Sequence, residues 1–295
     1  ARYDAILDAA ERVFPEKGYE RTSMDDIARS ASLSRALLYV YFKDKAAIQR
    51  GIMLRAGESL VARFREALKE ADTGLAQIRA MLRANSGFGN LRILLPMITT
   101  LEELRASKAL IQRVVRELTA EGYAVVAPQV GVMIEVPSAV YIASELAEEA
   151  DFLSVGSNDL TQYLLAVDRT NARVADMFDG FHPAVLRALE MTSKAGIQAK
   201  IPVALCGEMA GDPLAAVLLV GLGFNELSMS SAALAQVKRA LGEFSSVECR
   251  MLAEEALTRE SGIQVLRIVA QAFIDKHLNL LVPPNLRESL EVGIA

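Results

Sequence analysis

The second half of the chain holds short apolar runs that each end in a polar or reactive side chain. The runs are GVMIEVP, DFLSVGSNDLTQY, KIPVALCGE and ELSMS, and they end at or near Glu135, Asp159, Cys206 and Ser228. Short apolar runs of this kind are typical of buried β-strands. When parallel strands close into an α/β barrel, groups at their carboxyl ends converge on one cavity. The pattern therefore predicts an α/β domain with a functional site at its strand ends.

Strand-like and helix-like segments alternate through this region. The expected strands are 91–98, 130–136, 151–157, 201–206 and 226–230, and the expected helices are 101–121, 139–149, 182–195, 214–221 and 232–241. Such alternation predicts parallel βα units joined by right-handed crossovers. A closed (β/α)8 barrel needs eight units. The five that the sequence offers predict an incomplete barrel of the TIM type.

Residues 2–69 show only helical periodicity. A first helix is expected to stop at Gly18, because glycine commonly follows the last turn of a helix. Ser23 can cap a second short helix, and Ser34 a third that turns Leu38 inward. A helix, a tight turn and a second short helix packed on a first helix predict a helix-turn-helix. The fold class expected is therefore multidomain, with an all-α head ahead of the α/β part.

The ordered segment AILDAAERVFPEKGYERTSMDDIARSASLSRALLYVYFKDKAAI carries a family resemblance. Residues 2–50 resemble the DNA-binding head of TetR-family regulators, in which the third helix enters the major groove of double-stranded DNA. The resemblance implies base readers at Arg35, Ala36, Leu37, Tyr39 and Val40, and contacts to the DNA backbone from Tyr41, Lys43 and Lys45. Phosphate contacts position such a head, and base-edge contacts specify the sequence.

The head departs from that family's pattern at several positions. Ser32 and Ala36 stand where glycine is usual, so Ser32 is expected to adopt a left-handed turn conformation. Leu37 and Val40 replace smaller or polar residues, which reduces hydrogen-bonded reading of bases. Pro15 removes a backbone donor late in the first helix and is expected to end or kink it.

A second resemblance covers residues 75–281. The segments LRILLPMITTLEELR, GVMIEVPSA, DFLSVGSNDLTQYLLAVDR, HPAVLRALE and CGEMAGDPLAAVLLVGLGFNELSMS carry it. They resemble the C-terminal barrel of the phosphoenolpyruvate-utilising (PEP-utilising) enzymes, and in particular enzyme I of the bacterial sugar phosphotransferase system. The resemblance implies a PEP-dependent phosphotransferase fold with Mg²⁺ as cofactor.

Site roles carry over from this family position by position. The resemblance implies that Glu135 and Asp159 bind Mg²⁺, and that Asn158 and Arg169 bind the phosphate of PEP. It implies that Cys206 is the acid that protonates the enolate carbon when pyruvate forms. The chemistry agrees, because Mg²⁺ prefers carboxylate oxygens and a guanidinium matches a phosphoryl group.

Other residues of the same motifs receive supporting roles. Glu208 and Asp212 are expected to stabilise the loop that follows Cys206. The family's phosphate-binding arginines on early strands, and its domain with the phosphoryl-accepting histidine, have no counterpart here. Early-strand arginines stabilise much of the transferring charge. Complete phosphotransfer by this chain alone is therefore not expected.

Composition limits the remaining function classes. The 295 residues carry a formal net charge of −5, which argues against a surface that coats nucleic acid generally. Two cysteines far apart in the sequence suggest neither a disulfide framework nor a thiolate zinc site. No apolar run approaches the roughly 20 residues that cross a bilayer. We expect a cytoplasmic protein without a membrane partner.

The expected domains are a TetR-like head with a connecting helix (1–74), a barrel fragment (75–281) and a tail (282–295). The leading hypothesis is a composite of a DNA-binding head and a truncated, Mg²⁺-dependent, PEP-binding phosphotransferase barrel whose catalysis is impaired. A second hypothesis is a transcriptional regulator whose barrel fragment pairs two subunits into a homodimer or senses a ligand. A third is an artificial or non-functional fusion. The operator sequence and the phosphoryl acceptor stay open.

Overall fold

The computed structural model describes residues 2–69 and 73–292. The chain forms two compact units. The first comprises residues up to 89 together with 114–126, and the second comprises 90–113 and the residues from 127 onward. Each unit is built on its own apolar core, so each is considered by itself.

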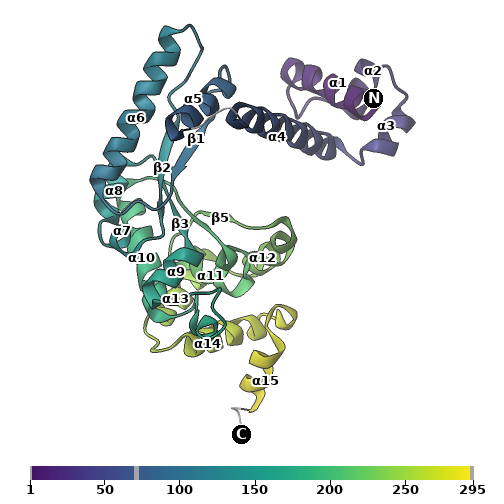
Figure 1. Ribbon diagram of the computed structural model, residues 1–295. Coiled ribbons are helices and arrows are strands. Elements are labelled where there is room, and N and C mark those ends of the chain that lie inside the picture. The colour runs from purple at the N-terminus through teal and green to yellow at the C-terminus, as the bar shows by residue number, and fades with distance from the viewer. Residues whose placement is uncertain (1, 70–72, 293–295) are drawn as a thin grey trace. The chain divides into compact units, whose positions relative to one another are not determined.

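The first unit is helical. Its helices are α1 (Arg2–Lys17), α2 (Met24–Ser30), α3 (Arg35–Tyr41), α4 (Lys45–Lys69) and α5 (Gly74–Ala84), and the last turns of α6 (Leu101–Ala120) also belong to it. Figure 1 shows α1, α2 and α3 gathered at the N-terminal end of α4. Their shared core includes Ile6, Ile27, Leu38 and Phe42, all buried. The helix-turn-helix expected from the sequence is confirmed.

Side-chain caps determine where the short helices of the head begin. The Ser23 hydroxyl accepts from the Asp26 amide, and the Asp26 carboxylate accepts from the Ser23 amide, which completes a capping box. Ser34 caps α3 through the Leu37 amide. Between the two helices Ser32 has a φ of 56°, so the predicted left-handed turn is present without glycine. Pro15 lies inside α1, and the helix ends two residues later at Lys17.

The second unit contains a parallel sheet and the helices around it. The strands are β1 (Arg92–Leu95), β2 (Gln129–Ile134), β3 (Phe152–Gly156), β4 (Val203–Cys206) and β5 (Glu226–Ser228). The remaining elements are α6, α7 (Pro137–Tyr141), α8 (Ala143–Glu149), α9 (Ser157–Leu165), η1 (Ala175–Met177), α10 (Pro183–Ala199), η2 (Glu208–Gly211), α11 (Pro213–Gly221), α12 (Ser231–Glu243), α13 (Ser246–Leu257), α14 (Gly262–Asp275), η3 (Asn279–Leu281) and α15 (Pro284–Val292).

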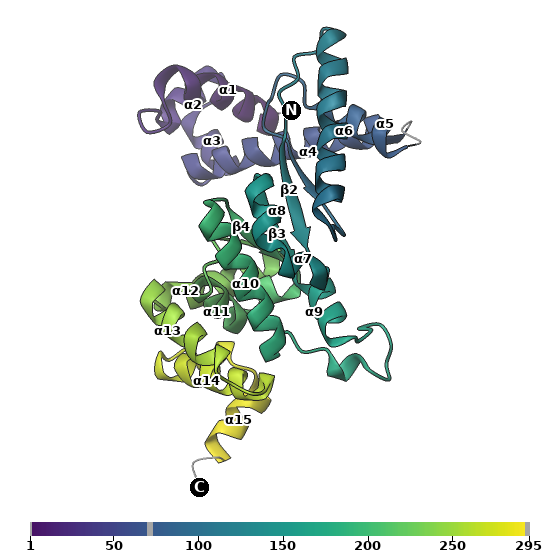
Figure 2. The same cartoon turned by 90° about the vertical axis from the view of Figure 1, so that its left-hand side faces the viewer.

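All five strands are parallel, in the order β1-β2-β3-β4-β5. The face that carries Val132, Leu153 and Leu205 is buried, and α7 and α10 are among the helices that pack against these strands. Figure 2 shows α8 and α10 beside each other, as their packing requires. This arrangement confirms the predicted strand number and the incomplete α/β barrel.

The opposite face of the sheet is the inner face. Side chains from the alternate strands β1, β3 and β5 lie at the same level across this face and form one layer of it. Gly131 of β2 is paired in register with Phe152 of β3, and a Cβ at Gly131 would lie 2.3 Å from the Phe152 ring. The Arg92 guanidinium of β1 lies 4.0 Å from the centre of that ring, and its Nη1 is 3.7 Å from Oε2 of Glu226 in β5. Side chains from alternate strands thus fill one layer, as in closed barrels.

Two features differ from the expected elements. The helix expected over 139–149 is split at Ile142 into α7 and α8. Three helices, α13 to α15, follow the last strand, and α15 lies in the expected tail, whose residues 293–295 are outside the described residues. Within the described part of the chain, no helix combines the length and the apolar character needed to span a membrane.

We predict that Gly131→Ala destabilises the second unit. The added methyl group would overlap the ring of Phe152, which is buried and has little room to move. Overpacking of this kind costs about 1–3 kcal/mol. Urea unfolding followed by circular dichroism should show a lower midpoint, and Phe152→Leu in the same chain should restore part of it.

Gly242→Ala is the matched control. Gly242 lies in α12, and a Cβ there would meet no atom within 4 Å. Alanine is a better helix former than glycine by roughly 0.5–1 kcal/mol, so this variant should be unchanged or more stable. Equal midpoints for the two alanine variants would contradict the close contact between Gly131 and Phe152.

Candidate functional site

Glu135 follows the last residue of β2 and lies at the carboxyl end of the sheet. The residue is 4% exposed, and its Oε1 accepts a 2.7 Å hydrogen bond from the Met97 amide. A Cβ at Gly156 of the neighbouring strand would lie 2.8 Å from Oε2 of Glu135, so glycine leaves room for the carboxylate. Among the described residues, no basic group lies within ion-pair distance of Glu135. A buried carboxylate without a counter-charge is costly and favours a cation nearby.

The donor to Glu135 comes from a strained backbone. Met97 lies two residues beyond β1 and has a φ of 54°, in the left-handed region that non-glycine residues seldom adopt. The methionine side chain is half exposed, so packing does not explain the conformation. The conformation instead accompanies the hydrogen bond from the Met97 amide to the carboxylate. Strained residues of this kind are held by their surroundings and gather at functional sites.

Cys206 ends β4 and is paired in register with Gly156. Its Sγ lies 3.4 Å from the Val155 carbonyl oxygen, and its own carbonyl accepts from the Ser157 hydroxyl at 2.7 Å. Burial raises the pKa of the Cys206 thiol above its usual value, and the negative charges of Glu135 and Asp159 raise it further. The thiol therefore keeps its proton at neutral pH, and the site around it carries negative charge.

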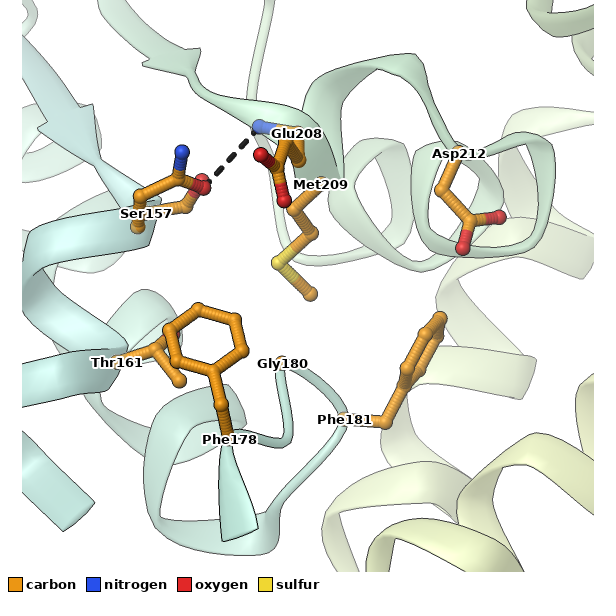
Figure 3. Close-up of a pocket in the computed structure, with 9 residues that line it drawn as sticks. Ser157, Thr161, Phe178, Gly180, Phe181, Glu208, Met209 and Asp212 are labelled. Atoms are coloured by element: carbon orange, nitrogen blue, oxygen red, sulfur yellow. Dashed lines mark hydrogen bonds between the residues drawn. The ribbon is translucent and has the colours of Figure 1, made fainter. Parts of the chain in front are cut away.

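Asn158 and Asp159 lie in the first turn of α9, directly after β3. Oδ1 of Asn158 accepts from the Glu208 amide at 3.2 Å, which ties α9 to the loop after Cys206 (Figure 3, dashed line). Asp159 forms a 3.1 Å ion pair with Nη2 of Arg169, and both side chains are partly exposed. Arg169 thus pairs with a residue expected to bind Mg²⁺.

The structure brings four of the five expected metal-binding, substrate-binding and catalytic residues together. Glu135, Asp159 and Cys206 are close enough for the two carboxylates to raise the pKa of the thiol, and Arg169 joins them through Asp159. Asn158 also lines a neighbouring pocket of about 140 Å³, which the other four do not line. The described residues contain no group of three or more His, Cys, Asp or Glu side chains arranged to hold a metal ion.

Several contacts of the site could not be read from the sequence motifs. The backbone amide of Met97 and the hydroxyls of Ser154 and Ser157 contact site residues, although none of them carries a distinctive pattern. Asp212 caps α11 through the Leu214 amide at 2.8 Å, which matches its expected role in the loop. For Ser157, the one sequence signal that could have pointed to the site is its position directly after a buried strand.

In the head, most of the expected DNA-contacting side chains lie on the surface. The exposed ones are Arg35, Ala36, Tyr39, Val40, Tyr41 and Lys43, whereas Leu37 is half-buried. Arg35 pairs with Asp25 at 3.1 Å and lies over the Tyr39 ring. Lys45 donates to the carbonyls of Tyr19 and Glu20, so its ammonium group is engaged within the head.

We predict that alkylation of Cys206 reports the charge of Glu135. Glu135→Gln removes a negative charge that raises the thiol pKa, so the pH midpoint of iodoacetamide alkylation should move down. Because more thiolate is then present, the rate at neutral pH should rise severalfold. The measurement uses a Cys249→Ala background in the presence of a chelator.

Glu145→Gln is the matched control, since Glu145 is an exposed carboxylate on α8. It should leave the midpoint unchanged. An unchanged midpoint in Glu135→Gln as well would mean that the carboxylate and the thiol do not share one site.

Two family profiles match this chain. Residues 62–246 match the family profile described as "PEP-utilising enzyme, PEP-binding domain". Residues 6–50 match the profile described as "Bacterial regulatory proteins, tetR family". Both resemblances that the sequence carries are thereby confirmed.

Two sequence relatives agree with this assignment, and one solved structure was compared with the fold. A protein of Escherichia coli (strain K12) named "Phosphoenolpyruvate-dependent phosphotransferase system" is 46% identical over 214 residues, which cover 72% of this chain and 28% of the relative. A "Phosphoenolpyruvate-protein phosphotransferase" of Haloferax volcanii is 43% identical, over 68% of this chain and 36% of its own length. A solved citrate lyase from Burkholderia xenovorans LB400 is 20% identical over 73% of each chain, with a TM-score of 0.45. The chain belongs to the PEP-utilising enzyme family.

Proposed function

We propose that the strand-end site of the second unit binds PEP together with Mg²⁺. The observation that supports this most is Glu135, a buried carboxylate whose only hydrogen bond among the described residues comes from a backbone amide. A cation would offset the cost of burying that charge. Asp159 lies in the first turn of α9, the helix after the next strand, and would supply a second carboxylate.

These residues fit a hard cation. Mg²⁺ takes oxygen ligands and keeps several waters, so two carboxylates with water and substrate oxygens would complete its shell. When bound, the ion would neutralise the oxygens of the phosphate and carboxylate of PEP. Glu135 and Asp159 would hold it. Gly156 would keep the space beside Glu135 open.

Arg169 and Asn158 would bind the phosphate. A guanidinium presents parallel N–H donors that match phosphate oxygens, and the Asn158 amide nitrogen adds a further donor. Arg169 is paired with Asp159 in this structure. Binding of the metal by Asp159 would therefore release Arg169 toward the substrate, which couples the two binding steps.

Cys206 would act on the carbon end of PEP. The raised pKa of the thiol keeps a proton on Sγ at neutral pH. A protonated thiol beside the substrate is able to donate that proton to an enolate carbon. Because this chain spans 28% of the length of the Escherichia coli relative, complete phosphoryl transfer to an acceptor is not part of the proposal.

Calorimetry with PEP tests the proposed site. Wild-type protein should release heat of binding with PEP in the presence of Mg²⁺. Glu135→Gln should lower that affinity about tenfold or more, equivalent to about 1.4 kcal/mol, because the metal loses a charged ligand. Glu145→Gln should match the wild type. If neither the wild type nor either variant releases heat with PEP and Mg²⁺, the assignment of PEP as a ligand is wrong.

The Asp159→Asn variant distinguishes the contribution of the metal to PEP binding from the contribution of the phosphate contact. The variant should lose the Mg²⁺ dependence of binding, because Asp159 would be a metal ligand. Without Mg²⁺, however, it should bind PEP severalfold more tightly than the wild type, because Arg169 is no longer paired with a carboxylate. If metal-free binding does not rise, Arg169 does not contact the phosphate.

We also propose that the head binds double-stranded DNA through α3. The support is the exposure of Arg35, Tyr39 and Val40 on a capped helix, the last of them 76% exposed, while Leu38 anchors the same helix in the core. Val40 offers apolar contact and no hydrogen bond to bases. The ion pair between Arg35 and Asp25 would have to break before Arg35 contacts a base or a phosphate of the DNA.

Salt titration of DNA binding tests the head. Lys43→Ala should weaken binding to a mixed-sequence duplex and reduce the slope of log K against log salt concentration by about 0.9, the value for one lost phosphate contact. Lys238→Ala, an exposed lysine on α12, is the control and should leave the slope unchanged. Equal slopes for wild type and Lys43→Ala would exclude this lysine from the interface.

A further inference from the structure

A second pocket lies beside the proposed PEP site and has a different character. It is formed by the start of α9, by η2 and by the loop that follows η1, and its volume is about 140 Å³. Figure 3 shows the Phe178 and Phe181 rings rising from the loop, with the side chain of Met209 between them and the carboxylate of Glu208 directed into the space. The lining is therefore aromatic and apolar on one side, with the polar side chains of Ser157, Asn158 and Thr161 and the carboxylates of Glu208 and Asp212 around the rest.

The charged groups of this pocket are all negative. Glu208 and Asp212 line it, and no lysine, arginine or histidine does. Among the described residues, neither carboxylate has a basic partner within ion-pair distance. Asp212 caps α11 through Oδ1, and burial raises the pKa of its carboxyl group. An acidic field without counter-charge attracts a cation.

The walls favour an organic cation over a metal ion. Mg²⁺ and Ca²⁺ need six or more oxygen ligands, whereas the exposed lining of this pocket is largely apolar and the described residues hold no group of three or more His, Cys, Asp or Glu side chains arranged for a metal ion. Aromatic faces attract cations that carry little water, and a planar guanidinium both stacks on rings and binds a carboxylate through parallel N–H donors. Phe178, Phe181 and Glu208 provide these two kinds of contact.

The aromatic wall is held in place from outside the pocket. Asp179, between the two aromatic positions of the loop, accepts from the Phe181 amide at 2.9 Å. Its carboxylate also packs on the first residue of α14, where a Cβ at Gly262 would lie 1.9 Å from Oδ2. The loop can approach α14 this closely only because residue 262 is glycine, and this contact holds the aromatic wall in place.

We propose that this pocket binds the guanidinium group of a small organic cation, with the group against the aromatic wall of Phe178 and Phe181 and its N–H donors on Glu208. The pocket shares Asn158 with the proposed PEP site, whereas Glu135, Asp159, Arg169 and Cys206 do not line it, so the proposal concerns a neighbouring site. The same chemistry occurs in free guanidines and in arginine side chains. The structure provides a cavity of limited volume, which suits a free small molecule.

Ligand-observed NMR with methylguanidinium tests the proposal on the full chain. N-methylurea is the matched probe, because it has nearly the same shape and no charge. Methylguanidinium should bind saturably, and N-methylurea about tenfold more weakly or not at all. Glu208→Gln should lower methylguanidinium affinity about tenfold, since it removes the charge and keeps the size of the side chain. Glu254→Gln, an exposed carboxylate on α13, should have no effect.

Gly262→Ala tests the wall without changing any charge. It should weaken methylguanidinium binding by displacing Asp179, while circular dichroism confirms that the chain is folded. No saturable binding, equal binding of the two probes, or an unchanged affinity in Glu208→Gln would each overturn the proposal. N-acetyl-arginine amide is the last ligand to be compared in the same NMR measurement. Tighter binding of this compound than of methylguanidinium would assign the pocket to a peptide side chain and overturn the assignment to a free guanidine.

Discussion

The contact between Phe152 and Gly131 sets the arrangement of the second unit. Neighbouring residues in a parallel sheet face the same side, so this pair places Met133 beside Ser154 and Glu135 beside Gly156 in the next two layers of the inner face. A register shift by one residue would turn every one of these side chains to the helix-covered face. The site at the strand ends therefore depends on the packing two layers below it.

The same face changes character from one end of the strands to the other. Near the strand starts it holds a large ring and the Arg92–Glu226 pair, and near the strand ends it holds glycine, serine and cysteine. Small residues at the carboxyl end leave space, and one buried acid occupies part of it. A second acid, Asp159, is neutralised by Arg169, which comes from the loop directly after α9, the helix that carries Asp159. The negative charge left at Glu135 is what makes the site suited to a cation.

Much of this could be predicted from the sequence, for identifiable reasons. The five strands and the caps at Ser23 and Ser34 are local properties of short segments, so pattern and spacing were sufficient, whereas the left-handed Ser32 followed from the resemblance to TetR-family heads. The break at Ile142 was missed because apolar periodicity continues across it. The Asp159–Arg169 pair and the contact of Asp179 with Gly262 were missed because loop conformation and tertiary packing decide them. The roles of the site residues stay predictions.

The amide of Met97 has a consequence for variation at that position. Its bond to Glu135 is made by the main chain, so it does not depend on which side chain the residue carries. Nearly all substitutions would keep this donor, and a glycine would in addition relieve the left-handed strain. Proline alone would delete the N–H and restrict φ to negative values. At position 97 the carboxylate thus keeps its donor through any substitution except proline, and the left-handed backbone decides which of the other side chains are tolerated.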